Sequence, residues 1–234
     1  MKNHKNSDFF VYGIGIVIAL FIGWKVIAYI LPDKPVYTPE TFLAAVMEAS
    51  GGKDNWKAIQ TISYRKEYTL FTEDSLIEIS RNENHSYINA QQYNRIDWEA
   101  ENIPYSLIKN GDSLYQYNNT IIDTTVTRKQ LVNKLQSATF VLGLPYTLDT
   151  SPASLAYVGE QIFNGELAHR LEVRFDGSYD IWWLYYDDAL NWLGYLVKTS
   201  DHYSLVINEE MQDISGFTLS RKRKSYRSDE LMNI

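Results

Sequence analysis

The sequence contains one short motif that is typical of covalent catalysis. Ser63-Tyr64-Arg65-Lys66 matches the S-x-x-K pattern, in which the serine is the nucleophile of an acyl enzyme. That motif belongs at the start of a helix, whereas these residues lie in a strand-like run, and no S-D-N or K-T-G motif accompanies them. We therefore expect no acyl transfer at Ser63 and predict no catalytic residue.

The sequence shows no pattern of metal ligands. It has no cysteine, which excludes zinc–thiolate sites, disulfides and thiol nucleophiles. Asp187-Asp188 falls at a predicted turn, and a calcium loop would need more oxygen ligands at regular spacing. The histidines are far apart, without H-E-x-x-H spacing: His4, His85, His169 and His202. We predict no metal site and no cofactor.

The longest apolar run extends from Phe9 to Leu31 and contains a single charge, Lys25. About 20 apolar residues in a helix match the thickness of a bilayer, so residues 9–31 are predicted to form a transmembrane helix. A cleavable signal peptide is the alternative, but Ile27–Pro32 offers no small-residue cleavage site. Lysines before the run favour a cytoplasmic N-terminus, with the remainder of the chain on the other side.

The remaining chain divides by composition. Residues 1–8 form an N-terminal tail, 32–38 a proline-containing linker, 39–227 a single domain and 228–234 a C-terminal tail. The formal net charge of −7 argues against a nucleic-acid partner, because such binding requires basic surface.

Two amphipathic helices are predicted within the domain. Thr38 caps the first, and Gly51-Gly52 ends it. The second spans Thr127 to Leu142, carries one apolar stripe, and stops at Gly143. A brief helical turn is expected at Trp56–Ile59.

Period-2 alternation between turn residues predicts strands over most of the rest. Asn110-Gly111-Asp112 and Asn164-Gly165 predict hairpin turns. The first strand has one apolar face, which Lys66 interrupts. The predicted strands are 62–70, 76–80, 87–98, 106–109, 114–122, 155–163, 167–175, 180–186, 193–199, 203–211 and 217–226. We expect a mainly β fold with some α: an unclosed antiparallel β-barrel, formed by one curved sheet and covered by a few helices.

Several short motifs in this pattern resemble a known family. Arg95-Ile96-Asp97-Trp98 precedes the hairpin of residues 106–117, in which an Asn-Gly-Asp turn leads to a Leu-Tyr-x-Tyr strand. Phe140–Gly143 closes the following helix, and an aromatic strand at Trp182–Asp187 ends in aspartate before a turn. These features resemble the bacterial lipoprotein-carrier fold family of outer-membrane lipoprotein carriers and lipoprotein-sorting proteins. The resemblance covers most of residues 51–227.

The resemblance implies a half-barrel, lidded by helices, whose apolar interior holds the acyl chains of lipid or lipoprotein. A sheet too wide to be filled by its own side chains leaves such a cavity. Known carriers are free or lipidated, whereas this chain has a predicted membrane span and no lipid-bearing cysteine, which argues against shuttling between membranes. The candidate cavity residues are Tyr64, Arg65, Tyr68, Arg95, Trp98, Leu131, Leu135, Leu171, Val173, Trp183, Leu205 and Ile207.

Three features of the domain have two interpretations each. Arg65 and Arg95 either latch a helical lid from inside the cavity or belong to a solvated strand face. The basic run, defined as Arg221, Lys222, Arg223 and Lys224, is either a membrane-surface contact or a charged sheet edge that prevents aggregation. Strand 180–187 is bulky on both faces, so it is either covered twice or exposed to a partner.

These observations favour a non-enzymatic, membrane-tethered protein that binds lipid or a lipidated polypeptide in envelope lipid handling. Its partners would be the bilayer, through residues 9–31, the lipid cargo and an envelope protein. We expect it in the inner membrane, with the domain on the periplasmic side. The alternative is an interaction or sensor module of a cell-envelope complex that carries no lipid.

Overall fold

The computed structural model describes residues 35–72 and 75–234 of the chain. The transmembrane helix predicted at residues 9–31 lies outside the described residues. Within the described part, no helix combines the length and the apolar character needed to cross a bilayer. The chain divides into two units, Met1–Tyr37 and Thr38–Ile234, and the second unit contains the elements discussed below.

The two amphipathic helices predicted within the domain are confirmed. Helix α2 (Pro39–Ala49) begins at Thr38, whose hydroxyl accepts from the Thr41 backbone N–H in a reciprocal capping box. Thr127 caps α4 (Arg128–Leu142) in the same manner, with Gln130 as its partner. The short helix α3 (Lys53–Ala58) includes most of the expected turn. Two 3₁₀ turns follow elsewhere, η1 (Asn89–Gln91) and η2 (Tyr146–Asp149).

The strands form two six-stranded antiparallel meanders, each in sequence order. Sheet A contains β1 (Thr61–Phe71), β2 (Ile77–Ile88), β3 (Tyr93–Ala100), β4 (Ile103–Asn110), β5 (Ser113–Asn118) and β6 (Ile121–Ile122). Sheet B contains β7 (Ala153–Phe163), β8 (Glu166–Phe175), β9 (Ile181–Tyr186), β10 (Trp192–Lys198), β11 (Tyr203–Ile214) and β12 (Phe217–Ser228). The predicted turn at Asn164-Gly165 is confirmed, with both residues at positive φ.

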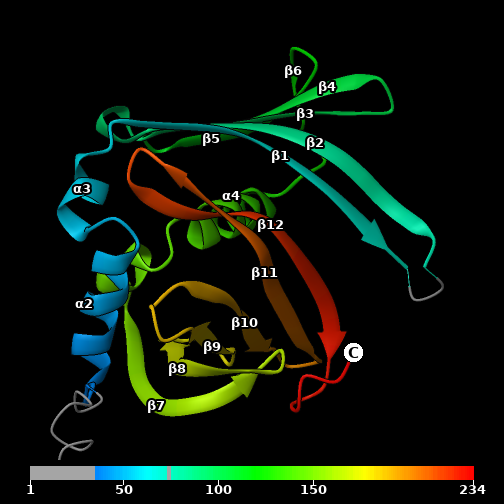
Figure 1. Ribbon diagram of the computed structural model, residues 1–234. Coiled ribbons are helices and arrows are strands. Elements are labelled where there is room, and N and C mark those ends of the chain that lie inside the picture. Colours follow the sequence, from blue (N-terminus) through cyan, green and yellow to red (C-terminus); the bar gives the residue numbers. More distant parts are fainter. Residues whose placement is uncertain (1–34, 73–74) are drawn as a thin grey trace, which may run out of the picture. The chain divides into compact units, whose positions relative to one another are not determined.

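The mainly β fold with few helices is confirmed, but the strands form two sheets where one curved sheet was expected. Residues 123–152, which include α4 and η2, separate β6 from β7 in the chain. No ladder of hydrogen bonds joins the two sheets within the described residues. Figure 1 shows sheet A above, sheet B curled beneath it, and α4 between them.

Two predicted strands are interrupted. The expected strand 114–122 is divided at Asn119, which has a positive φ, into β5 and β6. The expected strand 87–98 is interrupted by η1 and by Gln92 in a left-handed conformation, so it contributes to both β2 and β3. Strand β2 starts at Ile77 and continues through residues 81–86, which the prediction left unassigned. These residues are polar on both faces, and polar side chains conceal the alternation that identifies a strand.

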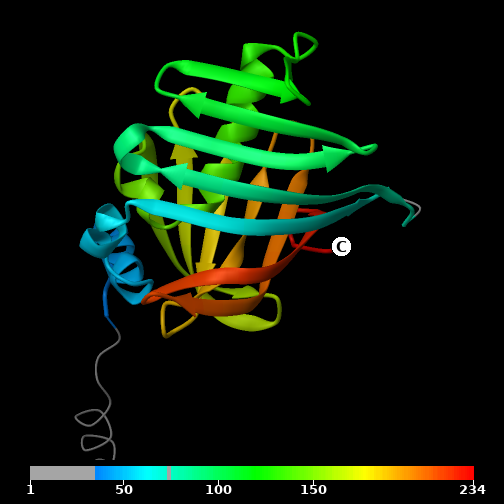
Figure 2. The ribbon, with the colours of Figure 1, turned by 90° about the horizontal axis from the view of Figure 1, so that it is seen from above.

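The β11–β12 hairpin connects sheet B to the helices beneath β1. Irregular pairing around Asn208 and Glu210 interrupts its ladder, and such bulges bend a strand. The far end of the hairpin lies near β1 in both views (Figures 1 and 2). There the ring of Phe217 contacts Trp56 edge to face. Gly51, at φ 123°, permits this approach, because a Cβ there would clash with the Gly216 carbonyl.

Candidate binding site

The inward face of sheet A is identified by the residues that contact α4. Ile96 and Leu107 on this face pack with Leu131 and Leu135 of α4. The register of pairing extends the same face to the two outer strands. On β1 it consists of Ile62, Tyr64, Lys66, Tyr68 and Leu70, and on β2 of Tyr87, His85, Glu83, Arg81 and Ile79.

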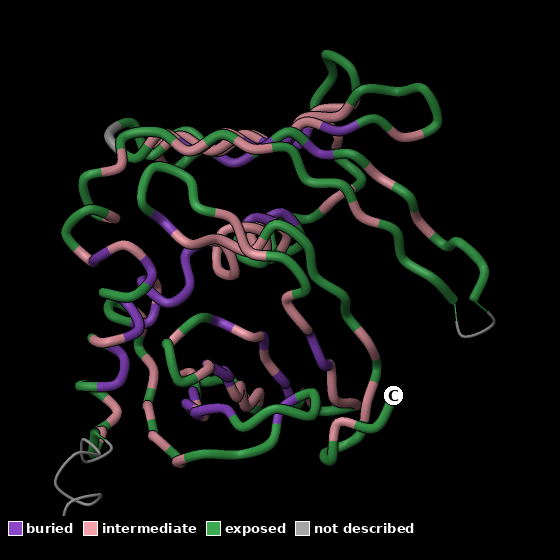
Figure 3. Tube along the Cα trace, in the orientation of Figure 1, coloured by how far each residue is buried: buried purple, intermediate pink, exposed green. Residues whose placement is uncertain are grey.

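Coverage of this face falls sharply along β2. His85 is 1% exposed and Glu83 is also buried, whereas Arg81 and Ile79 are half-buried. On β1, Tyr64 and Tyr68 are half-buried, and Leu70 is 46% exposed. Figure 3 shows the exposed outer end of the β1–β2 hairpin. Large apolar side chains therefore face inward but remain in contact with solvent.

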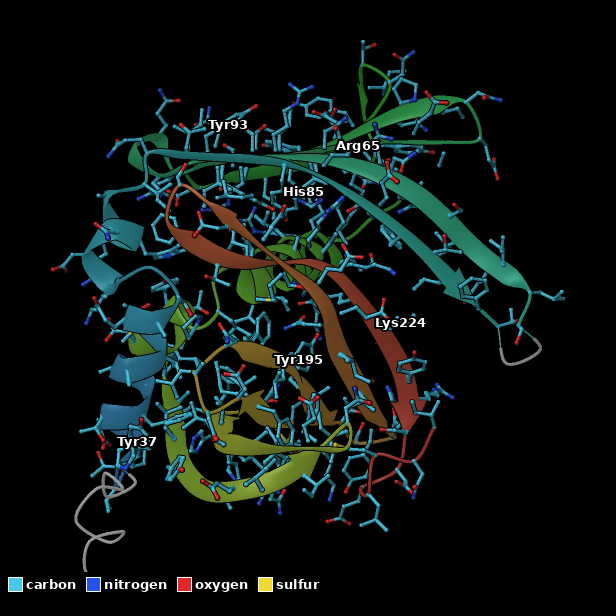
Figure 4. The ribbon with its side chains drawn as sticks, viewed as in Figure 1. Tyr37, Arg65, His85, Tyr93, Tyr195 and Lys224 are labelled. Atoms are coloured by element: carbon cyan, nitrogen blue, oxygen red, sulfur yellow. The ribbon has the colours of Figure 1, made fainter. Side chains whose placement is uncertain are left out.

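The closed end of this face holds a chain of hydrogen-bonded polar groups. His85 Nε2 lies 3.0 Å from Glu83 Oε2, and His85 Nδ1 lies 2.8 Å from the Tyr87 hydroxyl. Tyr68 donates to the other Glu83 oxygen at 3.2 Å, and the Tyr64 ring stacks on the imidazole at 4.6 Å. Figure 4 shows His85 below sheet A, on the side of β11 and β12, and Tyr93 on the opposite side.

The protonation of this chain follows from its contacts. Burial alone would raise the pKa of the Glu83 carboxyl, but the hydrogen bond with His85 and the nearby charges of Lys66 and Lys134 outweigh it. The pKa of Glu83 is therefore lowered, and its carboxylate accepts from His85 Nε2–H. That tautomer leaves Nδ1 to accept from Tyr87, whose own pKa burial raises.

Three cations, two from strands and one from α4, lie at this inward face between its closed and open ends. Lys134 Nζ of α4 lies 3.1 Å from the centroid of the Trp98 ring, and Arg81 Cζ lies 5.8 Å from that ring. Lys66 Nζ lies 4.6 Å from the centroid of the Tyr68 ring. These contacts have the geometry of cation–π interactions.

Sheet B presents its own inward face to α4 and to sheet A. Phe140 of α4 contacts the rings of Trp182 and Phe175 edge to face. Arg223 of β12 is exposed to solvent, yet desolvation by the surrounding protein lowers its pKa. Its charge acts on both Tyr64 of β1 and Tyr195 of β10.

Seven of the predicted cavity residues lie on inward faces or on α4. They are Tyr64, Tyr68, Trp98, Leu131, Leu135, Leu171 and Val173. The remaining five lie elsewhere. Arg65 and Arg95 are on the outward face of sheet A, each paired with a carboxylate: Glu67 at 2.6 Å and Asp97 at 2.7 Å. Both arginines therefore belong to a solvated strand face, and neither lies inside a cavity.

The other three, Trp183, Leu205 and Ile207, lie on the far face of sheet B. There a second core forms around Phe163 and Tyr185, whose rings stack at 4.3 Å, and Met232 of the C-terminal tail packs against it. Tyr185 is 1% exposed and Tyr186 is fully buried. Strand β9 is therefore covered on both sides at these positions. The bulky residues on both of its faces no longer indicate a surface for a protein partner.

The basic run is divided by the pleat of β12. Lys222 and Lys224 form ion pairs with Glu209 at 3.0 and 2.6 Å. Arg221 lies 3.7 Å from Glu210. Arg223 alternates to the inward face, where it lies 5.5 Å from the ring of Trp192. Membrane attraction by this run remains a prediction, and the carboxylates of β11 reduce its charge.

The S-x-x-K motif is split by the same alternation. Ser63 points outward and lies 3.3 Å from the hydroxyl of Ser86, whereas Lys66 lies on the inward face. A serine and a lysine on opposite faces of a strand cannot exchange a proton directly.

The structure also brings together groups that the sequence did not connect. Glu160, His169 and Asp188 place one potential metal-ligand atom each within 4.8 Å of one another. Residues 160 and 169 pair across the β7–β8 hairpin. The turn predicted at Asn164-Gly165 implies this pairing, so the sequence could have placed Glu160 next to His169. Separately, a pocket of about 230 Å³ is lined by Lys53, Trp56, Lys57, Asn89, Tyr146, Thr147, Asp149 and Thr150. It is smaller than the roughly 300 Å³ at which ligand pockets usually begin.

Comparison with known proteins gives similarity of fold. No family model and no curated protein matches the sequence. A DUF1329 family protein from Desulfovibrio piger has a similar structure, with a TM-score of 0.53, 10% identity, and coverage of 82% of this chain and 87% of that chain. The Mycobacterium tuberculosis lipoprotein LppX gives a TM-score of 0.30, 12% identity, and coverage of 80% and 93%. At such identity, the likeness to the Desulfovibrio protein concerns the fold alone.

Proposed function

We propose that this protein binds the acyl chains of a lipid or a lipidated polypeptide on the inward face of sheet A, without enzymatic chemistry. One observation carries the proposal: on the β1–β2 half of this face, large apolar side chains point inward yet remain exposed. Leu70 is the clearest example, and Tyr64, Tyr68 and Ile79 are half-buried.

The energetics favour an apolar ligand at this face. Each methylene removed from water contributes about 0.8 kcal/mol, so one acyl chain gains several kcal/mol without any directional contact. The tyrosines suit such a surface, because their rings add apolar area while their hydroxyls stay near polar groups.

The cellular setting of this activity is proposed from the sequence alone. Residues 9–31 would tether the domain to the inner membrane, on the periplasmic side, within reach of membrane lipid. The motifs shared with lipoprotein carriers and the two-sheet architecture both suit the handling of envelope lipid or lipoprotein. A short linker would keep the domain close to the bilayer surface.

A charge placed on the inward face tests the proposal. Leu70→Asp should abolish the acyl species that accompany the purified full-length protein, measured by native mass spectrometry and by solvent extraction. Its neighbour Thr69 is exposed on the outward face, so Thr69→Asp is the matched control and should keep the wild-type lipid. Equal lipid content in both variants, or wild-type protein without any acyl species, would reject the site.

A further inference from the structure

We infer that Lys66, Arg81 and Lys134 form a subsite for the acidic head group of an amphiphile whose tail lies on the open part of the same face. This subsite rests on the proposed function and specifies its ligand class: an acyl chain that carries a carboxylate or phosphate. The three residues come from β1, β2 and α4, so the subsite requires the folded unit.

The first argument is the contrast between inward and outward cations. On the strand surfaces that face solvent, several cations have carboxylate partners, as Arg65, Arg174 and Lys224 do at 2.6 Å each. No ion pair forms between Lys66, Arg81 or Lys134 and the carboxylates of the described residues. Lys66 and Lys134 lie over the rings of Tyr68 and Trp98, and Arg81 lies near the Trp98 ring and forms a hydrogen bond with Tyr68. In a chain with a net charge of −7, this local excess of positive charge is unusual.

The second argument is the state of the nearest carboxylate. Glu83 lies beside Lys66 and Lys134, but its two oxygens already accept from His85 and Tyr68. The carboxylate of Glu83 is therefore the one negative charge beside three positive charges, those of Lys66, Arg81 and Lys134. Its hydrogen bonds hold it at the closed end of the face. An additional anion would complete the balance.

The third argument is electrostatic. Burial, followed by the charges of Arg81 and Lys66, lowers the pKa of Lys134 to about 8, although Glu83 opposes the shift. Like charges held close together in a partly desolvated place repel one another. A bound anion relieves that repulsion, so the three cations favour a negatively charged ligand.

The position of the cations selects an amphiphile over a free anion. Tyr68, Leu70 and Ile79 continue the same face from the cations toward its open end. A head group at Lys134 therefore places an attached chain on half-buried or exposed apolar side chains. The charged contact fixes the orientation of the chain, which apolar contacts alone do not.

Equilibrium dialysis of the full-length protein with radiolabelled oleate, oleyl alcohol and inorganic phosphate tests the subsite. Oleate and oleyl alcohol share a chain and differ in charge. We expect oleate to bind about tenfold more tightly than the alcohol, since a charge-assisted hydrogen bond contributes roughly this factor or more. Lys134→Met should reduce oleate binding to the level of the alcohol and leave alcohol binding unchanged. Lys129→Met, at an exposed position of the same helix, should change neither.

The outcomes separate this inference from the proposed function. Equal binding of oleate and oleyl alcohol would overturn the subsite and leave an apolar site intact, whereas no binding of either would overturn both. Phosphate that binds as tightly as oleate would overturn the assignment to an amphiphile. Should Lys134→Met fold poorly, as judged by circular dichroism, Lys66→Met provides the same test from β1.

Discussion

The two halves of the inward face of sheet A have the same architecture but different exposure. On β3 and β4, Ile96 and Leu107 are fully buried beneath Leu131 and Leu135 of α4. On β1 and β2, residues of the same face are half-buried or exposed beyond Glu83. The pleat and the pairing are alike, so the difference arises from which strands the helix covers. One half stabilises the fold, and the other half retains surface that a ligand can bury.

The largest expected difference between these halves is in stability. Leu107→Ala should lower the free energy of unfolding by about 3 kcal/mol, because it leaves a cavity beneath α4. Leu70→Ala should cost less than about 1 kcal/mol, because Leu70 is already exposed to solvent. Urea unfolding monitored by circular dichroism measures both. Similar losses in the two variants would mean that the β1–β2 half is also packed.

A smaller effect is expected at the boundary between the halves. Glu83→Gln should lower the free energy of unfolding at pH 7 by about 1–2 kcal/mol, because it removes the charge from a buried hydrogen bond with His85. The pKa of Glu83 is lowered in the folded protein, so its contribution is present above the unfolded pKa and disappears as the pH falls through the folded pKa.

Glu67→Gln is the control for that experiment, since its ion pair with Arg65 is exposed and should contribute less than about 0.5 kcal/mol. Denaturant unfolding from pH 7 to pH 3 should show the Glu83→Gln difference shrinking at the acid end. A difference that is constant over this range would contradict the role assigned to the carboxylate.

Local signals in the sequence predicted most of the elements but not their division into two sheets. Caps at Thr38 and Thr127, the Asn-Gly turns and the period-2 runs depend on neighbouring residues, and they placed helices and hairpins correctly. Whether two strands far apart in the sequence pair at a sheet edge depends on tertiary geometry that no local pattern encodes. The expected single sheet failed for that reason.

The candidate site shows the same limit. Alternation identified the face of Tyr64 and Tyr68, and Lys66 was visible as an interruption of that face. Arg81 lies in a tract that is polar on both faces, and Lys134 borders the apolar stripe of α4, so neither was distinguishable from a solvated residue. Their convergence on Trp98 depends on the placement of α4 across the sheet.

The smallest expected effect is on the pH dependence of the free energy of unfolding. It concerns Lys134, which lies at the boundary between the covered and the uncovered halves of the face. The folded pKa of about 8 is below the ordinary lysine pKa of 10.5, so between these pH values the unfolded chain binds a proton that the folded protein does not. Stability relative to Lys134→Met should therefore rise with pH across this window, by about 1 kcal/mol once solvent screening is included. Because tyrosine titration affects both proteins alike, the difference between their unfolding curves at pH 7.5 and pH 10 isolates Lys134. A difference that falls with pH would mean that Lys134 already has an anionic partner within the folded protein, which would contradict the proposed subsite.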